Sequence, residues 1–512
     1  MKRHAPKKIF HSRLLTVGSL IILQALIMLL AILKFNTYFV YFYSGCVVLS
    51  ILEVFVIINK EVNPAYKLAI CIPILILPIF GGLFYLFLGN SHLSRIQKSI
   101  LTDSFEAREE QLIQDRSVYS ELRNHNRSIA NQVKYVYDTC GYPVYRNSET
   151  CYLSPGEKLF AKMKEELRKA KQYIFIEYFI INEGVMWSEI LEILKEKASE
   201  GVDVRIIYDD VGCIDLLPYN YDKELEASSI KCRVFNRLTP IVSMWHNNRD
   251  HRKITVIDGD VAFTGGANIA DEYINEVERF GYWKDSGIMI KGDAVWTFTI
   301  MFLNFWAAIG GEEIRDYSDF RSQKDNSSMK DGYVLPYGDT PLDDETLGEN
   351  IYLNVINKAE RKIYICTPYF IVDNETMTAI CLAAKSGVDV RIVTPYIEDK
   401  WYVHMITRSY YRQLIESGVK VYEYTPGFIH SKTVVADDET GIVGSINFDF
   451  RSMYLTFECA VLMYRSKAVK ELALDFEEIL KVSQVVTIEE CAREKWYKKA
   501  LTMILRLFSP LL

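Results

Sequence analysis

The sequence has no excess of positively charged residues. Of its 512 residues, 59 are Lys or Arg and 66 are Asp or Glu, so the formal net charge is -7. Domains that bind nucleic acid usually have a basic balance or a basic stripe. The composition therefore argues against nucleic acid as a partner, although it allows a local basic pocket.

Paired cysteines are missing as well. Ten cysteines are present, but none forms a CxxC pair, and no acidic cluster has the spacing of metal ligands. We therefore predict no metal site and no cofactor. The irregular cysteine spacing in a chain of this size favours free thiols in a reducing compartment.

Long apolar runs, by contrast, are concentrated near the N-terminus. Leu14 to Leu33 carries no charge and has the roughly 20 residues that cross a bilayer. A second run, over residues 37–58, has Glu53 as its only formal charge, and a third, over 68–88, has none. A cleaved signal peptide would have a shorter apolar core and a small-residue cleavage site. We predict a membrane anchor of two or three apolar segments over residues 1–92 and a connecting segment over 93–130.

The charges that flank the first run predict the topology of this anchor. Five Lys or Arg residues precede the run, whereas the short loop after it has only Lys34. Cytoplasmic flanks carry the excess of Lys and Arg, so the N-terminus is expected in the cytoplasm. Two spans would leave the rest of the chain in the cytosol, and three would export it. Because free thiols favour the cytosol, we predict a multi-pass protein of the cell membrane whose larger part faces the cytosol. The oligomeric state stays open.

Beyond the anchor, short apolar strands alternate with amphipathic helices, which is typical of an α/β fold. This pattern occurs twice. GVDVRIIYDD at 201–210 returns as GVDVRIVTPY at 387–396, QYIFIEYFI at 172–180 returns as IYICTPYFI at 363–371, and HRKITVID at 251–258 returns as HSKTVVAD at 430–437. Solenoid repeats are much shorter, so the sequence indicates a duplicated domain.

The duplication sets the predicted boundaries. We expect a first half over residues 131–314, a linker over 315–342 and a second half over 343–490. The polar stretch over 315–332 would also fit a surface loop within one domain. Basic and apolar residues interleave over 491–512, which favours an amphipathic helix on a membrane surface; an ordinary helix packed on the core is the alternative.

The repeated motif has the form HxKxxxxD with a glycine-rich tail. It begins at His251 and again at His430, and a GGxN or GSxN sequence follows each at the same offset. The tails contain Gly265, Gly266 and Asn268 in the first copy and Gly444, Ser445 and Asn447 in the second. Two copies with matching tails make chance a poor explanation.

Strand geometry predicts which motif residues act together. Residues i and i+2 of a strand share a face, so His251 should project with Lys253, and His430 with Lys432. An ammonium beside an imidazole suits a phosphate, because the lysine neutralises the oxyanion while the imidazole attacks phosphorus or moves a proton. Two histidines would divide these tasks if the halves pack about a pseudo-twofold axis. Asn268 and Asn447 are predicted to donate amide hydrogen bonds to the same oxygens.

The acidic residues are predicted to have supporting roles. Asp258 and Asp437 lie seven residues past their histidines, an odd number, so we expect them to brace the motif and face away from the phosphate. Each histidine still needs a carboxylate that orients it. Asp285 and Glu458, on the following strand of each half, are the candidates.

The doubled motif with its tail resembles the phospholipase D superfamily, from about residue 130 onward. Within that superfamily the chain is most similar to bacterial cardiolipin synthases. This similarity is carried by NPAYKLA at 63–69, PIFGGLFYLFLG at 78–89, EYFII from Glu177, the His251 motif and RLFSPLL at 506–512. It implies a bilobed, duplicated α/β/α sandwich with pseudo-twofold symmetry, preceded by transmembrane helices, and it adds Glu177, Gly266 and Ser445 to the supporting residues.

The resemblance also implies a reaction. One histidine attacks the phosphorus of a phosphatidylglycerol and releases glycerol, and a second phosphatidylglycerol then displaces the phosphatidyl-histidine to give cardiolipin. Family precedent favours His251 as nucleophile and His430 as proton donor and later base; the symmetry of the two motifs alone leaves this assignment open. With two steps, the phosphatidyl-histidine intermediate conserves the energy of the phosphodiester bond until the second lipid attacks, provided that water is excluded.

Other functions on the same fold remain as alternatives. They are a phosphatidylserine synthase, a hydrolytic phospholipase D, a nuclease and a membrane scaffold without catalysis. Apolar segments at the N-terminus argue against the nuclease, and the two intact motifs argue against the scaffold.

Overall fold

The computed structural model describes residues 39–78, 109–238, 247–312, 314, 316–493 and 495–511, together with Leu26 and Leu29. Apart from these two leucines, the first predicted apolar run and its basic flank lie outside the described residues. The same holds for the third run beyond residue 78 and for most of the predicted connecting segment before residue 109.

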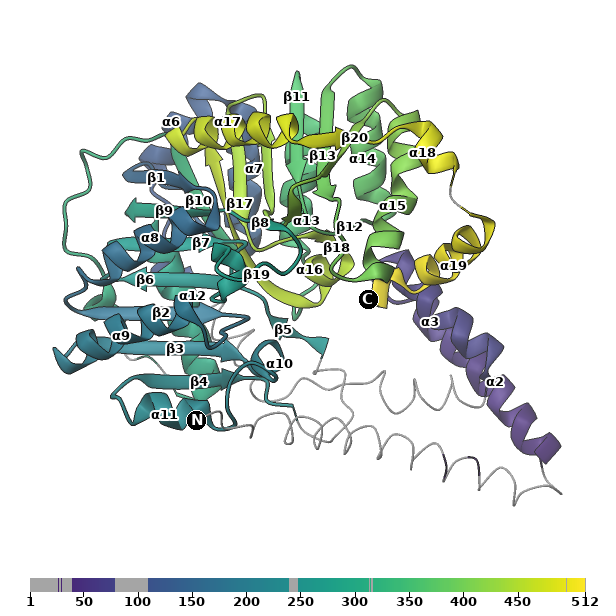
Figure 1. The fold of residues 1–512 in the computed structure, drawn as a ribbon, viewed down its shortest axis with the longest axis horizontal. Helices are drawn as coiled ribbons and strands as arrows, with labels where there is room; N and C mark the ends of the chain where they lie inside the picture. The colour runs from purple at the N-terminus through teal and green to yellow at the C-terminus, as the bar shows by residue number, and fades with distance from the viewer. Residues whose placement is uncertain are drawn as a thin grey trace.

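Two large β-sheets with the same strand order form the body of the molecule (Figure 1). The first has the order β1-β9-β7-β6-β2-β3-β4, and the second has the order β10-β19-β17-β16-β11-β13-β14-β20. The strands of the first sheet are β1 (Ser148–Leu153), β2 (Tyr173–Tyr178), β3 (Asp203–Asp209), β4 (Lys231–Phe235), β6 (Lys253–Ile257), β7 (Val261–Gly265) and β9 (Gly287–Gly292). Those of the second are β10 (Tyr333–Asp339), β11 (Lys362–Cys366), β13 (Asp389–Pro395), β14 (Lys420–Tyr424), β16 (Thr433–Ala436), β17 (Thr440–Gly444), β19 (Thr456–Tyr464) and β20 (Ser483–Val485). The duplicated α/β fold predicted from the repeats is confirmed.

Alternating side-chain directions explain how helices cover both faces of the first sheet, whose strand β2 is buried throughout. Ile174 and Ile176 of β2 pack in one hydrophobic cluster with α8 (Gly156–Leu167) and α9 (Val185–Ser199). Phe175, between them, points to the other face and stacks on Phe302 of α12 (Val295–Gly310) at a ring distance of 4.5 Å. The sequence period of two thus places helices on both faces of this sheet.

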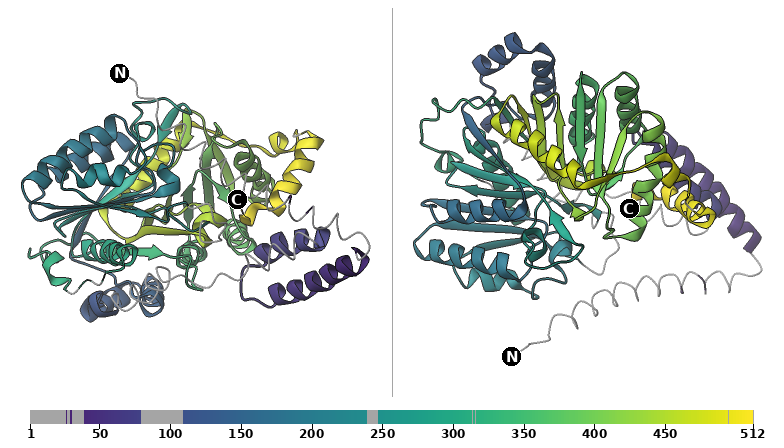
Figure 2. Two further views of the ribbon diagram at one scale, coloured as in Figure 1. Left: turned by 90° about the horizontal axis from the view of Figure 1, so that it is seen from below. Right: turned by 45° about the horizontal axis from the view of Figure 1, so that its top comes forward.

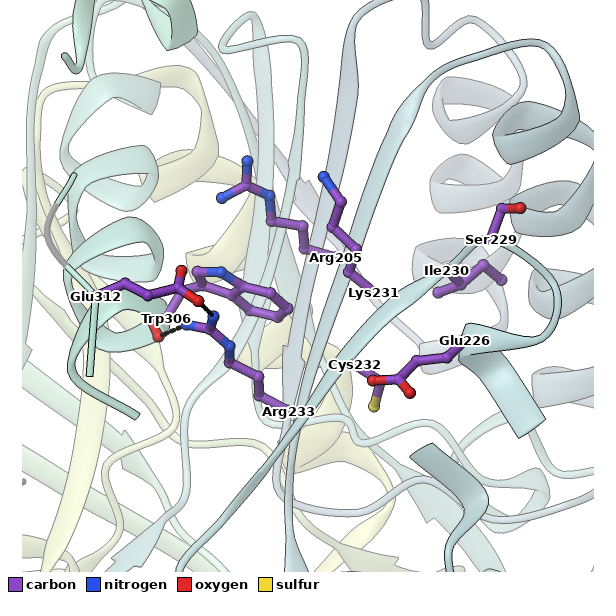
Figure 3. A pocket seen from close by; sticks show the side chains of 9 residues that line it. All are labelled: Arg205, Glu226, Ser229, Ile230, Lys231, Cys232, Arg233, Trp306 and Glu312. Atoms are coloured by element: carbon purple, nitrogen blue, oxygen red, sulfur yellow. Dashed lines mark hydrogen bonds and ion pairs between the residues drawn. The ribbon is translucent and has the colours of Figure 1, made fainter. Parts of the chain in front are cut away.

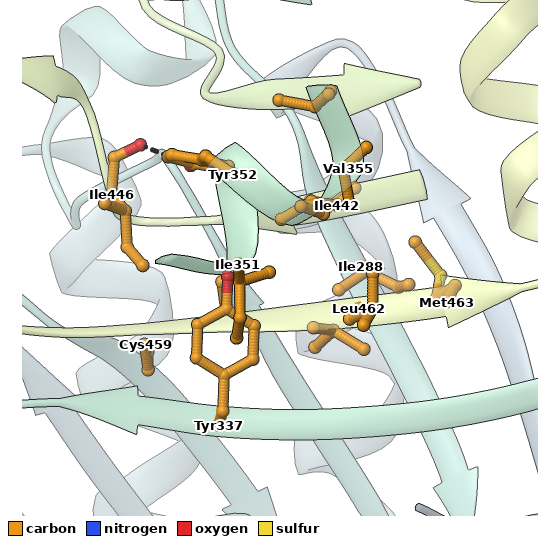
Figure 4. Close-up of a cluster of buried hydrophobic side chains, with 14 of the residues drawn as sticks. Ile288, Tyr337, Ile351, Tyr352, Val355, Ile442, Ile446, Cys459, Leu462 and Met463 are labelled. Carbon is orange, nitrogen blue, oxygen red and sulfur yellow. Dashed lines mark hydrogen bonds between the residues drawn. The ribbon is translucent and has the colours of Figure 1, made fainter. Parts of the chain in front are cut away.

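The two halves share a core. Helix α12 packs on β4 and β6 of the first sheet and also on β10 of the second. Figure 4 shows Ile288 of β9 beside second-half residues such as Ile442 and Leu462, all in one buried cluster. On the second sheet lie α13 (Leu347–Lys358), α14 (Asn374–Lys385) and α17 (Lys467–Lys481).

The predicted boundaries need correction at two places. Strand β10 pairs with β19 in the second sheet, so this sheet begins inside the stretch that was predicted as a linker over 315–342. Strand β10 is short and contains Pro336, which an edge strand tolerates. Helices α6 (Arg116–His125) and α7 (Arg127–Cys140) occupy the end of the predicted connecting segment, and α7 runs across its boundary.

One described helix, α2 (Phe39–Ile58), is long and apolar enough to cross a membrane. A loop joins it to α3 (Pro64–Ile76), a shorter apolar helix that lies beside α2 and next to the second half (Figure 2). Near α3 lies α19 (Trp496–Leu507), within the predicted C-terminal amphipathic helix. Trp496, Met503 and Ile504 of α19 are exposed, whereas Arg506 stacks over Tyr410 of α15 (Trp401–Glu416).

Candidate active site

Two short pairings of parallel strands between the halves position the histidines. β5 (Arg249–Asp250) leads to His251 and pairs with the start of β19, where the His251 backbone N–H donates to the carbonyl of Phe457 at 2.9 Å. β15 (Gly427–Ile429) leads to His430 and pairs with β8 (Tyr282–Lys284), where the His430 N–H donates to the carbonyl of Lys284 at 2.8 Å. Each histidine is therefore anchored to the backbone of the other half.

The orienting carboxylates cross between the halves. His251 Nδ1 lies 2.9 and 3.0 Å from the two carboxylate oxygens of Glu458. His430 Nδ1 lies 2.7 Å from Oδ2 of Asp285. The sequence identified both carboxylates, but each one serves the histidine of the opposite half, because each lies just past the strand segment that pairs across the interface.

The lysines share the faces of their histidines, as the strand period predicts. Lys253 Nζ donates to the backbone carbonyl of His251. Lys432 Nζ donates to the carbonyl of His430 at 2.5 Å and lies 3.0 and 3.1 Å from its ring nitrogens. Both lysine side chains are buried, so two cationic groups and two imidazoles are enclosed together.

Arg252 and Glu177 lie away from this cluster. Arg252 Nε pairs with Glu177 at 2.7 Å and with Asp250 at 3.0 Å, and the guanidinium stacks over Phe305 of α12. Burial raises the pKa of Glu177 well above its ordinary value, although Arg252 opposes this shift. The structure therefore places Glu177 beneath the first motif, in a buried ion cluster that supports β6.

Burial lowers the pKa of both histidines. For His251 the pKa falls well below its ordinary value, through burial and then through the charges of Lys253 and Lys432. For His430, burial and Lys432 lower the pKa to about 4, while Asp285 acts in the opposite direction. Both imidazoles are therefore neutral near pH 7 before an anionic substrate arrives.

The two carboxylates differ in their ionisation. Burial raises the pKa of Glu458 to about 7, although Lys253 and hydrogen bonds oppose it. Burial also acts to raise the pKa of Asp285, but His430 and Lys432 hold it below its ordinary value. Asp285 is thus an anion beside His430, where it favours the protonated form of that imidazole.

In the glycine-rich tails that follow the two motifs, Gly266 and Ser445 contact the carboxylates that hold the histidines. A Cβ at Gly266 would lie 2.3 Å from Oδ1 of Asp285, so only glycine leaves room for this side chain. At the matching position the hydroxyl of Ser445 donates to Glu458, and Thr456 donates to its other oxygen at 2.9 Å. Gly266 and Ser445 therefore act through the carboxylates.

The motif asparagines have partners other than the predicted phosphate. Asn268 Nδ2 donates to the hydroxyl of Tyr273 at 2.7 Å, and Asn447 Nδ2 donates to Ser452 at 3.0 Å. Both side chains are buried, where polar groups need internal partners. One N–H of each amide thus braces the loop after its motif. Each amide has a second N–H, so the contact with the phosphate stays a prediction.

Asp258 and Asp437 brace the hairpins, as predicted. Asp258 has a positive φ of 53°, and its carboxylate accepts three backbone N–H bonds from residues 171–173 at 2.8 to 2.9 Å. Asp437, with φ of 54°, accepts the same three bonds from residues 360–362 at 2.8 to 3.0 Å. Each aspartate thus ties its turn to the start of β2 or β11, on the side away from the histidine.

Aromatic rings form a wall that the sequence reasoning missed. Phe179 packs on His251 at 5.1 Å, while Tyr273, Trp283 and Phe428 surround His430 at 5.2 to 5.9 Å. Trp283 precedes Asp285 by two residues, and Phe428 precedes His430 by two. The same strand period that grouped histidine with lysine could therefore have found both rings.

Among the described residues, a surface pocket away from the motifs has no unpaired cationic side chain with which to bind an anion. A pocket of about 680 Å³ opens at the β3–β4 edge of the first sheet, where three cationic side chains lie near Trp306 (Figure 3). These cations already pair with Asp203 or Glu312, and no motif residue lines the pocket. In the described part of the chain, no group of three or more His, Cys, Asp or Glu side chains is arranged to hold a metal ion.

Comparisons with known proteins agree with this geometry. A family model described as "Cardiolipin synthase, PLD-like domain" matches residues 163–285 and 352–480, and one described as "Phospholipase_D-nuclease N-terminal" matches residues 48–90. An uncharacterized protein of Streptococcus mutans is 41% identical, covering 90% of this chain and 99% of its own length. Cardiolipin synthase from Halalkalibacterium halodurans is 35% identical, covering 89% of this chain and 91% of its own length.

A solved structure shares the fold. Phosphatidylserine synthase from Haemophilus influenzae has a TM-score of 0.55 at 17% identity, covering 74% of this chain and 98% of that one. At this identity the similarity concerns the fold alone.

Proposed function

The chain belongs to the cardiolipin synthase family of phospholipase D-type phosphatidyltransferases, and on this basis we propose that it converts two phosphatidylglycerol molecules into cardiolipin and glycerol. One observation carries the proposal: two neutral imidazoles, each held by a carboxylate from the opposite half, share a buried site with Lys253 and Lys432. Such a site can divide one displacement at phosphorus into two covalent steps.

In the first step, His251 Nε2 attacks the phosphorus of the donor lipid. The new P–N bond forms as the P–O bond to the headgroup glycerol breaks. His430, which takes up a proton from solvent when the anionic donor lipid binds beside it, gives this proton to the leaving oxygen. Glu458 supports the nucleophile by accepting the Nδ1 hydrogen of His251, which leaves the lone pair on Nε2. Lys253 and Lys432 neutralise the negative charge of the phosphoryl oxygens.

In the second step, the primary hydroxyl of another phosphatidylglycerol attacks the phosphatidyl-histidine. His430, now without its proton, accepts the hydroxyl hydrogen, and the P–N bond breaks to free His251. Asp285 stabilises the imidazolium that His430 becomes. The side chains of His251 and His430 are 16% and 8% exposed, which limits the access of water. This burial favours transfer to lipid over hydrolysis.

The different carboxylates support the division of roles. The ionised Asp285 favours a protonated His430. Glu458, whose pKa burial raises to about 7, is a weaker anion beside His251 and favours its protonated form less. A neutral His251 is the better nucleophile and a protonated His430 the better acid, in agreement with family precedent.

We also propose a multi-pass anchor in the cell membrane with the catalytic halves on the cytosolic face. The apolar helix α2 and the basic flank of the first apolar run support this topology. The ten cysteines, all among the described residues, form no disulfide bond with one another, which suits a reducing compartment. The exposed apolar side chains of α19 fit contact with the same membrane surface.

Product analysis with purified protein and labelled phosphatidylglycerol tests the function. Cardiolipin and glycerol are expected in equal amounts. His251→Ala should lower the rate by at least about 1000-fold, since the nucleophile is lost, whereas His125→Ala, an exposed histidine on α6, should stay within about twofold of the original rate. Free phosphatidic acid without cardiolipin would indicate a hydrolase instead.

Mass spectrometry of a His430→Ala variant tests the assignment of the nucleophile. Without its proton carrier, the protein should turn over slowly and accumulate a phosphatidyl adduct on His251. An adduct found in a His251→Ala variant on His430 would reverse the two roles.

A further inference from the structure

The two halves are alike at the motifs and opposite in charge just beyond them. Four residues past the motif asparagine, the first half has Glu272 and the second half has Arg451. Glu272 is buried and pairs with Arg279 at 2.9 Å. Arg451 is exposed, and among the described residues no carboxylate lies within ion-pair distance of it. Within the described part of the chain, the pseudo-symmetry of the site is therefore broken by a cation that forms no ion pair.

Arg451 lies at the border of the catalytic cluster. It belongs to α16 (Phe450–Tyr454), and its backbone carbonyl lies 3.2 Å from the hydroxyl oxygen of Thr456. The same hydroxyl of Thr456 donates to Glu458, the carboxylate that holds His251. The charge of Arg451 is near enough to help lower the pKa of His251.

Lys400 adds a second cation on the same side. It stands five residues past the end of β13, and its ammonium is exposed, 5.6 Å from the ring of Tyr369. The ring of Tyr369 lies 6.5 Å from that of Phe428, which packs on His430, so Lys400 stands beside the aromatic wall of the site. Five residues past the end of β3, the matching strand, the first half has the uncharged Ile214. Both extra cations thus belong to the second half alone.

Helix α16 is also docked on the segment that leads from the membrane. The ring of Tyr66 in α3 contacts Phe450 at 5.8 Å and Tyr454 at 5.5 Å. Asn63, the cap of α3, donates to the hydroxyl of Tyr454 at 2.8 Å. A lipid that approaches the histidines along the α2–α3 side therefore passes α16 and Arg451.

The proposed reaction creates a need for such cations. The acceptor phosphatidylglycerol carries its phosphodiester on the same headgroup glycerol as its attacking hydroxyl. Its anion must therefore come close to the phosphoryl group already held by Lys253 and Lys432, and like charges at short range repel each other. A cationic site next to His251 would offset this repulsion, and it would give no advantage to water, which carries no charge.

We propose that Arg451 and Lys400 form a binding site for the phosphate of the acceptor lipid, separate from the donor site at the two motifs. This inference rests on the proposed phosphatidyl transfer, and it specifies the side from which each lipid reaches the histidines. The donor lies on the motif lysines, and the acceptor enters from the side of the second half that carries α16 and the loop before α15.

A competition between two acceptors tests this site. Full-length protein in mixed micelles receives labelled phosphatidylglycerol together with 1-propanol, an alcohol without phosphate. Both acceptors attack the same phosphatidyl-histidine, so the ratio of cardiolipin to phosphatidylpropanol measures acceptor binding independently of folding and of the donor step. The double variant Arg451→Gln, Lys400→Gln should lower this ratio about tenfold, because two charge contacts with the acceptor are lost.

Two controls sharpen the result. Arg412→Gln removes one positive charge from the exposed surface of α15, where Arg412 pairs with Glu416, and should leave the ratio unchanged. Arg451→Lys keeps the charge, so its ratio of cardiolipin to phosphatidylpropanol should stay close to that of the unaltered protein. An unchanged ratio in the double variant, even with both products reduced equally, overturns the acceptor site. Absence of both products with the unaltered protein would instead overturn the proposed function.

Discussion

His251 and His430 occupy matching positions but face different carboxylates. Glu458, with a pKa raised to about 7 by burial, holds His251, and the ionised Asp285 holds His430. The difference is tied to one tail position, where glycine leaves room for Asp285 and the Ser445 hydroxyl binds Glu458. At the scale of single residues, near-identical motifs thus acquire unequal acid–base properties.

The buried lysines make the reaction sensitive to alkaline pH. Burial lowers the pKa of Lys253 to about 8 and that of Lys432 to about 7. Both values lie below the ordinary lysine pKa, so the protons that neutralise the phosphate are lost as the pH rises through this window. We expect kcat/KM for phosphatidylglycerol to fall between about pH 7 and 9, because this constant reports the free enzyme.

Initial rates at low substrate concentration in mixed micelles give this profile, and circular dichroism over the same range controls for unfolding. In a Lys432→Arg variant the guanidinium keeps its proton. The decrease in kcat/KM near pH 7 should therefore disappear, and only the decrease near pH 8, caused by Lys253, should remain. A rate that stays constant up to about pH 10 would contradict the prediction.

At the scale of elements, the β6–β7 and β16–β17 hairpins carry the motifs. Their turns begin with Asp258 and Asp437, both with positive φ, a conformation that aspartate tolerates better than most residues. Each carboxylate then accepts hydrogen bonds from three backbone N–H groups at the start of the neighbouring strand. The motif aspartate is therefore a structural clamp between two elements.

The clamp predicts a stability effect without a large catalytic effect. Asp258→Ala removes the acceptor for three backbone donors and should cost about 1–3 kcal/mol of unfolding free energy. The thermal midpoint should fall by roughly 2–4 °C for each kcal/mol, while kcat falls less than about tenfold.

Asp258→Asn is the matched control, because asparagine tolerates the same φ and keeps one acceptor oxygen; its effect should be smaller. Lys253→Ala should lower kcat by about 100-fold or more, since charge stabilisation at phosphorus is lost. A similar loss of kcat in Asp258→Ala would mean that the aspartate takes part in the chemistry.

At the scale of the whole molecule, the active site exists only where the halves meet. Each histidine takes its carboxylate and its backbone anchor from the opposite half, and α12 joins the two sheets into one core. On one side of this body lie α2, α3 and α19 (Figures 1 and 2). In the proposed topology, that arrangement orients a single site with respect to the membrane.

The proposed topology is testable in spheroplasts. An epitope tag after Leu512 and a tag before Met1 should both resist external protease and become digestible after permeabilisation, because both termini are expected in the cytosol. A periplasmic domain of another membrane protein serves as the positive control for digestion. A C-terminal tag that is digested in intact spheroplasts would require a further span and would place the active site outside.

The sequence alone determined the duplication, the pairing of each histidine with its lysine, the clamp role of Asp258 and Asp437, and the two orienting carboxylates. These features depend on local periodicity along a strand, which a linear pattern records. Only the tertiary structure decided which histidine each carboxylate holds, that β10 belongs to the second sheet, and that Asn268 and Asn447 brace loops. Those outcomes depend on strands that pair across hundreds of residues and on polar groups that burial forces to find partners, and neither condition is written in the spacing of the motif.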